Sequence, residues 1–171
     1  FVLPAAQEHG VEVLTRVVDY GGRFHGDMKR GHEFKPGDHR AYRPKGWVEA
    51  GHDRIEKMGA VIDRHEMDLL HFACLWNLSQ APVKSVVPTF IQEAGESARS
   101  IESKIEEFGR LPDIEFTADE VEEIMAAGDN TGCMKLKGAS RRHEKSERPD
   151  EWPMRPELLE LAGRHGLGTE W

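Results

Sequence analysis

Cysteine is almost absent from this chain, since Cys74 and Cys133 are the two cysteines among its 171 residues. Cys74 lies in an apolar stretch and Cys133 in a polar one, so they do not form the disulfide framework of a small secreted domain. No apolar stretch approaches the roughly 20 residues that a membrane-spanning helix needs. The first residues also lack the charged and then apolar order of a signal peptide. We therefore expect a cytoplasmic protein without a membrane partner.

Positively charged residues are fewer than negatively charged ones. The chain has 23 lysines and arginines against 31 aspartates and glutamates, which gives a net charge of −8. No run of five basic residues offsets this balance, so nucleic acid is not an expected partner. The length suits one domain with its own core. The chain begins at Phe1, in what has the pattern of the last turns of a helix that Gly10 ends, so we expect a fragment of a longer protein.

Residues 65–88 carry the clearest pattern in the sequence. Apolar residues recur at helical spacing over residues 69–78, which predicts a helix, within residues 66–80, with one broad apolar face. A break at Ala81-Pro82 follows, and residues 83–87 then predict a short buried strand that ends at Pro88. A helix that leads through a short turn into such a strand is typical of a parallel α/β unit.

Weaker patterns predict the remaining elements. Residues 11–18 are rich in β-branched side chains and predict a second buried strand. Residues 19–51 are polar and rich in glycine, without periodicity, and predict a long loop. Helices are predicted at residues 52–64, at 97–108, from a capping box at Thr117–Glu120, and at 157–164 within an otherwise charged tail.

The order of helix, short turn, strand and proline in residues 65–88 resembles the end of the barrel of the aldo/keto reductase family. In that family a helix of the type LALAWLLAQ leads into a strand of the type VTSVIPG. The resemblance covers about residues 2–127 and implies an α/β fold, the C-terminal portion of a (β/α)8 TIM-type barrel. The barrel is incomplete in this chain, because two strands cannot close it. Residues 1–127 would form the last strands and helices, with a basic and histidine-rich loop at 19–51, and residues 128–171 a C-terminal extension.

The resemblance also implies a function. Aldo/keto reductases transfer hydride between NADP or NAD and a carbonyl or alcohol substrate. This chain would supply the cofactor cradle, whereas the family's catalytic Asp, Tyr, Lys and His belong to the first four strands. We therefore expect the chain alone to be inactive, and unstable without the N-terminal part of the barrel or a second copy as partner. The alternative is a non-catalytic barrel relative or scaffold that binds a ligand or a partner.

Two segments correspond to the family's cofactor motifs. The seventh strand of the family continues in a pattern like VIAYSPLGRGLLTGK, and residues 13–27 place Gly22 and Gly26 where the family has glycines. Arg16 takes the position of the tyrosine that stacks on the nicotinamide ring. A guanidinium group can stack on an aromatic ring or attract a phosphate, although a salt bridge at the strand end is equally compatible with the sequence.

The second segment follows the eighth strand, where the family has patterns like IPGARSPEQLEEN. Pro88 matches, Thr89 takes the first phosphate position, and a helix beginning near residue 97 would offer an anion site. A capped amphipathic helix with solvated charges is the alternative. The cofactor-binding residues implied by the resemblance are Arg16, Val17, Asp19, Thr89, Arg99, Ser100, Ser103 and Lys104, and we expect Arg16, Thr89, Arg99 and Lys104 to line one surface at the carboxyl ends of the strands.

The long loop has two further properties. Between residues 23 and 45 it carries seven basic and three acidic residues, which suits either a mobile loop that closes over a pyrophosphate or a solvated insertion. Its His25, His32 and His39, with Glu33 and Asp38, could in principle surround zinc, but we expect no metal because cysteine partners are lacking. His71, on the apolar helix, is expected to be a hydrogen-bonded core histidine.

Overall fold

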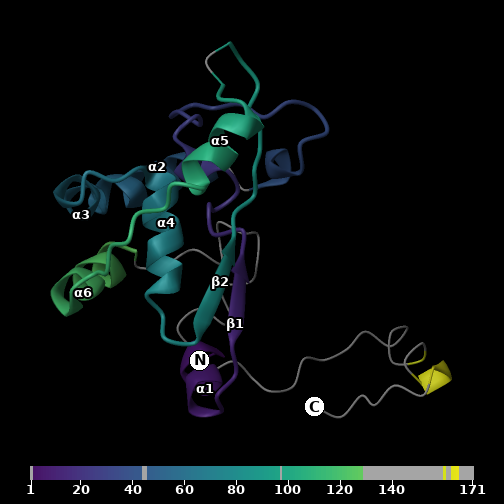
Figure 1. The fold of residues 1–171 in the computed structure, drawn as a ribbon. Helices are drawn as coiled ribbons and strands as arrows, with labels where there is room; N and C mark the ends of the chain where they lie inside the picture. Colours follow the sequence, from purple (N-terminus) through teal and green to yellow (C-terminus); the bar gives the residue numbers. More distant parts are fainter. Residues whose placement is uncertain (1, 44–45, 97, 129–159, 161–162, 166–171) are drawn as a thin grey trace.

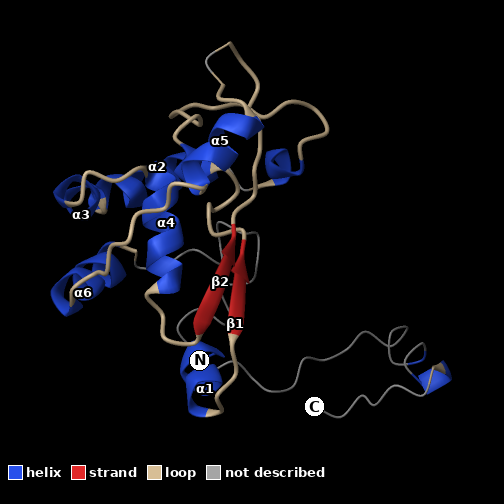
Figure 2. Cartoon of the chain, viewed as in Figure 1, coloured by secondary structure: helices blue, strands red, loops and turns tan. Residues whose placement is uncertain are grey.

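The computed structural model describes residues 2–43, 46–96, 98–128, 160 and 163–165. The chain is mixed α/β, with two parallel strands and helices beside and beyond them (Figure 2). The elements are α1 (Val2–Glu8), β1 (Val13–Arg16), the 3-10 helices η1 (Arg23–His25) and η2 (His39–Tyr42), α2 (Trp47–Lys57), α3 (Gly59–Arg64), α4 (Leu69–Leu78), β2 (Val83–Val87), α5 (Ile101–Phe108) and α6 (Ala118–Ala127). None of the helices in these residues is long and apolar enough to cross a membrane.

The two strands lie side by side and run in the same direction (Figure 1). Arg16 pairs with Val87 at the carboxyl end, and the register shifts once between Val13 and Leu14. β2 has the predicted bounds, whereas β1 is shorter than the predicted strand at residues 11–18. Val17 ends β1, because its φ of 59° lies in the left-handed region that a β-branched residue rarely adopts.

One face of this sheet is covered by α4. Leu70 and Cys74 on α4 are fully buried and form a small core with Val18 and with Val86 of β2. The other face carries Leu14, which is 59% exposed. In the described part of the chain, no element packs on that face, so the strands are covered on one side.

α4 begins later than the sequence predicted. The predicted helix at residues 66–80 starts at Leu69, since Glu66 has a left-handed φ of 48° and Asp68 is extended as the residue before the helix. Both conformations lie outside the helical region, so the first turn cannot form earlier.

A second core lies between α3, α4 and α6. It is formed by the buried side chains of Val61, Ile62, Met67, Phe72, Leu75 and Ile124. The single helix predicted at residues 52–64 is instead two helices, because α2 ends at Lys57 and α3 begins at Gly59. Glycine is a weak helix former, which favours a break there. Since α2 already begins at Trp47, the predicted loop at residues 19–51 is shorter than expected and contains η1 and η2.

The last two helices differ in how well the sequence predicted them. α5 begins at Ile101 rather than near residue 97, with Ser100 as its N-cap residue. The capping box of α6 is confirmed, and on this helix Ile124 is buried whereas Met125 is 64% exposed. The helix predicted at residues 157–164 lies largely outside the described residues, as does Cys133.

The α6 capping box makes stability depend on pH. The backbone N–H of Thr117 donates to Glu120, and His65 Nε2 lies 2.8 Å from the same carboxylate. The bond from Thr117 and then the contact with His65 lower the pKa of Glu120 from 4.5 to about 2. A carboxylate whose pKa falls on folding stabilises the fold above its unfolded pKa, and this contribution is lost as pH falls toward the folded value.

We expect Glu120→Gln to lower the thermal midpoint at about pH 6 and to have a progressively smaller effect as pH falls from 4.5 to about 2. Circular dichroism of both proteins across that interval measures the difference. Glu122→Gln is the matched control, since Glu122 is exposed on the same helix. An equal effect of Glu120→Gln at both ends of the interval would contradict the expectation.

Candidate functional site at the carboxyl ends of the strands

A buried carboxylate joins the segments that follow β1 and β2. Asp19 is fully buried, and it accepts hydrogen bonds from the backbone N–H of Gly22 at 2.7 Å and from that of Thr89 at 2.6 Å. His25 is also buried, with its Nε2 2.9 Å from the Thr89 carbonyl oxygen and 3.7 Å from Asp19 Oδ2. The contact between Asp19 and Thr89 joins residues 70 positions apart in the sequence. It holds the two segments together at the carboxyl ends of the strands. Asp19 therefore positions the chain around the candidate site.

Arg16 and Val17 occupy the exposed end of β1. The backbone N–H of Val17 donates to the Val87 carbonyl oxygen at 2.8 Å, which extends the pairing by one residue beyond Arg16. Val17 is 42% exposed, and Arg16 is exposed without an ion pair to any residue that the structure describes. Thr89 is half-buried and follows Val87 by two residues. The structure thus brings Arg16, Val17, Asp19 and Thr89 to one end of the sheet.

Lys104 lies inside the molecule. Its side chain is fully buried, its Nζ is 2.5 Å from Asp27 Oδ2, and it also donates to the Ile91 carbonyl oxygen. The sequence predicted Lys104 on an open anion-binding surface, but the structure places its ammonium group in a buried ion pair. Contact between Lys104 and a cofactor phosphate would require this pair to separate.

Arg99 also has internal partners. Its guanidinium group donates to the Glu107 carboxylate and, at 3.2 Å, to the His25 carbonyl oxygen. The hydrogen bond to Glu107 raises the pKa of Arg99. The side chain is still 39% exposed, so part of the charge remains available to solvent or to a ligand.

Ser100 and Ser103 cap the start of α5. The Ser100 hydroxyl oxygen accepts from the Ser103 backbone N–H at 3.1 Å, and the Ser103 hydroxyl donates to the Ser100 carbonyl oxygen at 3.0 Å. The start of α5 is therefore a capped helix, which was the alternative interpretation of this segment. Anion binding at the start of α5 stays a prediction.

Most arginines of the basic loop form hydrogen bonds with other residues of the chain. Arg40 is 4% exposed, and it donates to Glu93 at 2.6 and 2.9 Å and to Asp38 at 2.7 Å. Hydrogen bonds from Arg40 hold the pKa of Asp38 down at about 2. Arg30 pairs with Asp53 and Glu56 on α2, each at 2.8 Å. The described part of the loop is therefore fastened to α2 and to the segment after β2, and its closure over a pyrophosphate stays a prediction.

The histidines of the loop do not form a metal-binding cluster in the described residues. In the ranges that the structure describes, no three His, Cys, Asp or Glu side chains lie close enough together to hold a metal ion. His32 lies beside Glu93 at 3.4 Å. The predicted role of His71 is confirmed, because it is buried and its Nε2 is 2.7 Å from the Glu107 carbonyl oxygen.

Sequence patterns missed the acidic partners of the buried cations. Asp27 pairs with Lys104, and Glu93 pairs with Arg40 across 53 residues. No local motif links such distant positions, so only the folded chain identifies them. The sequence matches no protein-family model and no curated protein, and the likeness to aldo/keto reductases therefore rests on the residues quoted from the chain itself.

Proposed function

We propose that this chain is the C-terminal part of a cytoplasmic aldo/keto reductase-like oxidoreductase that uses NADP or NAD and acts on carbonyl or alcohol substrates. One observation carries the proposal: β1 and β2 are parallel, α4 covers one face, and Leu14, Arg16 and Val87 are exposed. In a (β/α)8 barrel the helices lie outside, and inward side chains of all eight strands fill the interior. The exposed face would then be the inner face of the barrel, which the first six strands of the parent would complete.

The position of Arg16 supports a role in cofactor binding. Barrel enzymes bind their ligands at the carboxyl ends of the strands, and Arg16 is the last residue of β1. Its exposed guanidinium group could stack on the nicotinamide ring or bind a phosphate. Thr89 would contact the cofactor from the neighbouring segment, while Asp19 holds both segments in place. The cofactor, when bound, supplies the hydride chemistry.

A second candidate function is supported by Lys104 and Arg99. Both cations already have carboxylate partners, Asp27 and Glu107. A site that had lost its need for a cofactor phosphate would neutralise its cations in this way. The internal ion pairs therefore favour the alternative, a non-catalytic barrel relative that binds another ligand or a partner.

A fusion protein tests the proposal. We expect the first six β/α units of an aldo/keto reductase, joined to the start of this chain, to oxidise NADPH or NADH in the presence of an aldehyde. Arg16→Ala should raise the KM for the cofactor roughly tenfold or more, since it removes a charge-assisted contact. Lys84→Ala is the matched control, because Lys84 is an exposed lysine near the opposite end of the sheet. The proposed role would be overturned by a fusion that folds but is inactive, or by an active fusion whose KM for the cofactor does not change with Arg16→Ala.

A further inference from the structure

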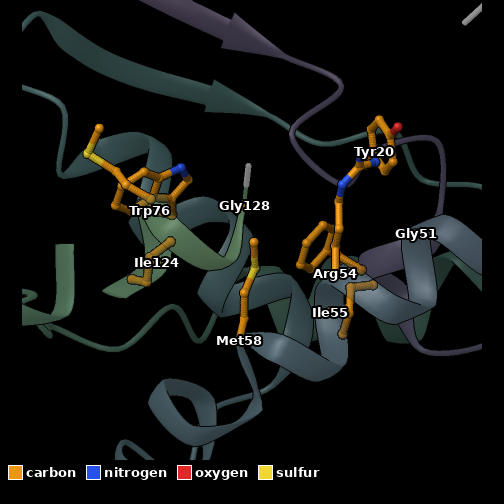
Figure 3. A pocket seen from close by; sticks show the side chains of 10 residues that line it. Tyr20, Gly51, Arg54, Ile55, Met58, Trp76, Ile124 and Gly128 are labelled. Atoms are coloured by element: carbon orange, nitrogen blue, oxygen red, sulfur yellow. The ribbon is translucent and has the colours of Figure 1, made fainter. Parts of the chain in front are cut away.

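A cavity of about 540 Å³ lies among η1, α2, α4 and α6, beside the turn that follows β1 (Figure 3). Its walls are mostly apolar and come from four separate elements, with Phe24, Ile55, Met58, Trp76, Ile124 and Met125 among the lining residues. Small-molecule sites are typically concave, apolar and roughly 300–1,000 Å³ in volume, with a few polar groups that orient the ligand. None of the residues proposed for the nicotinamide cofactor lines this cavity, so it would be a separate site.

One end of the cavity is polar. Figure 3 shows the Arg54 side chain extending toward Tyr20, while Trp76 and Ile124 lie at the other end. One turn away from Arg54 are Ala50, Gly51 and Lys57 on α2 and Met58 just after its end, none of which is acidic. No carboxylate of the described residues lies within ion-pair distance of Arg54. Its charge is therefore available to an anion in the cavity.

A second guanidinium group lies behind the same wall. Gly51 lines the cavity, and a Cβ atom at this position would collide with the guanidinium group of Arg23. Arg23 is 2% exposed and donates to the backbone carbonyl oxygens of Trp47 and Val48 rather than to a carboxylate. Burial lowers the pKa of Arg23 to about 10. A buried cation without a paired anion is costly, so a negative charge at this end of the cavity would stabilise it.

Tyr20 adds a strained hydrogen-bonding residue. Its φ is 52°, in the left-handed region, where non-glycine residues are strained and are enriched at ligand sites. The ring is held beside Trp47, at 5.6 Å between centroids, and the Arg23 guanidinium lies 5.7 Å from it. Among the residues described, the Tyr20 hydroxyl has no hydrogen-bond partner, so it can donate to a ligand oxygen.

We propose that this cavity binds an amphipathic monocarboxylate. The carboxylate accepts hydrogen bonds from Arg54 and from the Tyr20 hydroxyl, and the hydrocarbon part packs against Met58, Trp76 and Ile124. The charge of Arg23 behind Gly51 adds to the attraction, whereas the apolar walls disfavour a second charge on the ligand. This inference does not depend on the oxidoreductase proposal, because it uses different residues and no cofactor.

Titration calorimetry of the whole chain with decanoate tests the proposal. We expect saturable binding of one decanoate per chain, and weaker binding of decanol, which has the same chain length without the charge. Arg54→Gln should weaken decanoate binding about ten- to a hundredfold, since a hydrogen bond to a charged group is lost. Arg110→Gln is the matched control, because Arg110 is an arginine whose side chain is 77% exposed outside the cavity.

Three results would overturn the proposal: no saturable binding, equal affinity for decanoate and decanol, or an Arg54→Gln variant that binds as well as the unaltered chain. A photoreactive benzophenone side chain at position 125, which is exposed at the cavity, then identifies a competing occupant. Cross-links to peptides from residues 129–171 would assign the cavity to the chain's own C-terminal segment. Cross-links between two chains would assign it to a dimer contact.

Discussion

The purified chain of 171 residues is expected to show no NADPH- or NADH-dependent reduction of aldehydes or quinones above the rate in buffer. The resemblance places the proton donor and the lysine that lowers its pKa on strands that precede β1 in the proposed parent. The exposed face of β1 and β2 would also leave the nicotinamide without an opposite wall to align it with a carbonyl carbon. General acid catalysis and positioning each contribute on the order of 10² or more, so their joint loss removes many powers of ten in rate.

A steady-state assay with both cofactors and a panel of aldehydes and quinones measures this expectation. The active fusion with six upstream β/α units serves as the positive control under the same conditions. Clear turnover by the chain alone, abolished by Arg16→Ala, would mean that the catalytic groups lie in the chain itself. The division of labour inferred from the family resemblance would then be wrong.

The sequence predicted correctly the elements whose bounds are set by neighbouring residues. β2 follows from a β-branched run that a proline ends, and the capping box of α6 is complete within Thr117–Glu120. β1 was predicted too long at both ends, since it begins at Val13 and the positive φ of Val17 ends it at Arg16. The residues of the helix predicted at 52–64 are helical except Met58, which separates α2 from α3 and which the apolar spacing does not mark.

The candidate site was harder to predict, because tertiary contacts decide which of its charged side chains are paired and which are exposed. Arg16, Thr89 and Asp19 come together because parallel strands deliver their loops to one end, a consequence of topology that sequence order implies. Whether a lysine faces solvent or an aspartate many residues away depends on packing that no motif encodes. Lys104 was chosen by its place in a family pattern, and its pairing with Asp27 could be found only in the folded chain.

That pairing predicts a large loss of stability when Lys104 is replaced by alanine. The side chains of Lys104 and Asp27 are 0% and 3% exposed, so Lys104→Ala leaves a buried carboxylate without its counter-charge. Removal of one partner of a buried ion pair typically costs about 3–5 kcal/mol, whereas replacement of both by apolar residues is often neutral. Even complete domains are stable by only about 5–15 kcal/mol, and the chain alone is expected to be less stable than that. We therefore expect Lys104→Ala to lose much of its cooperative urea unfolding transition.

The double variant Lys104→Met with Asp27→Leu separates charge from packing in the same urea titration, and it should unfold close to the midpoint of the unaltered chain. Lys57→Ala, at an exposed lysine on α2, controls for the loss of a lysine and should change stability by less than about 0.5 kcal/mol. If Lys104→Ala fails to fold while the double variant folds, the buried pair is established as the cause. If Lys104→Ala instead unfolds within about 1 kcal/mol of the unaltered chain, the ion pair contributes little and the ammonium group can leave Asp27 at small cost. In that case Lys104 could bind a cofactor phosphate, because its separation from Asp27 would cost little free energy.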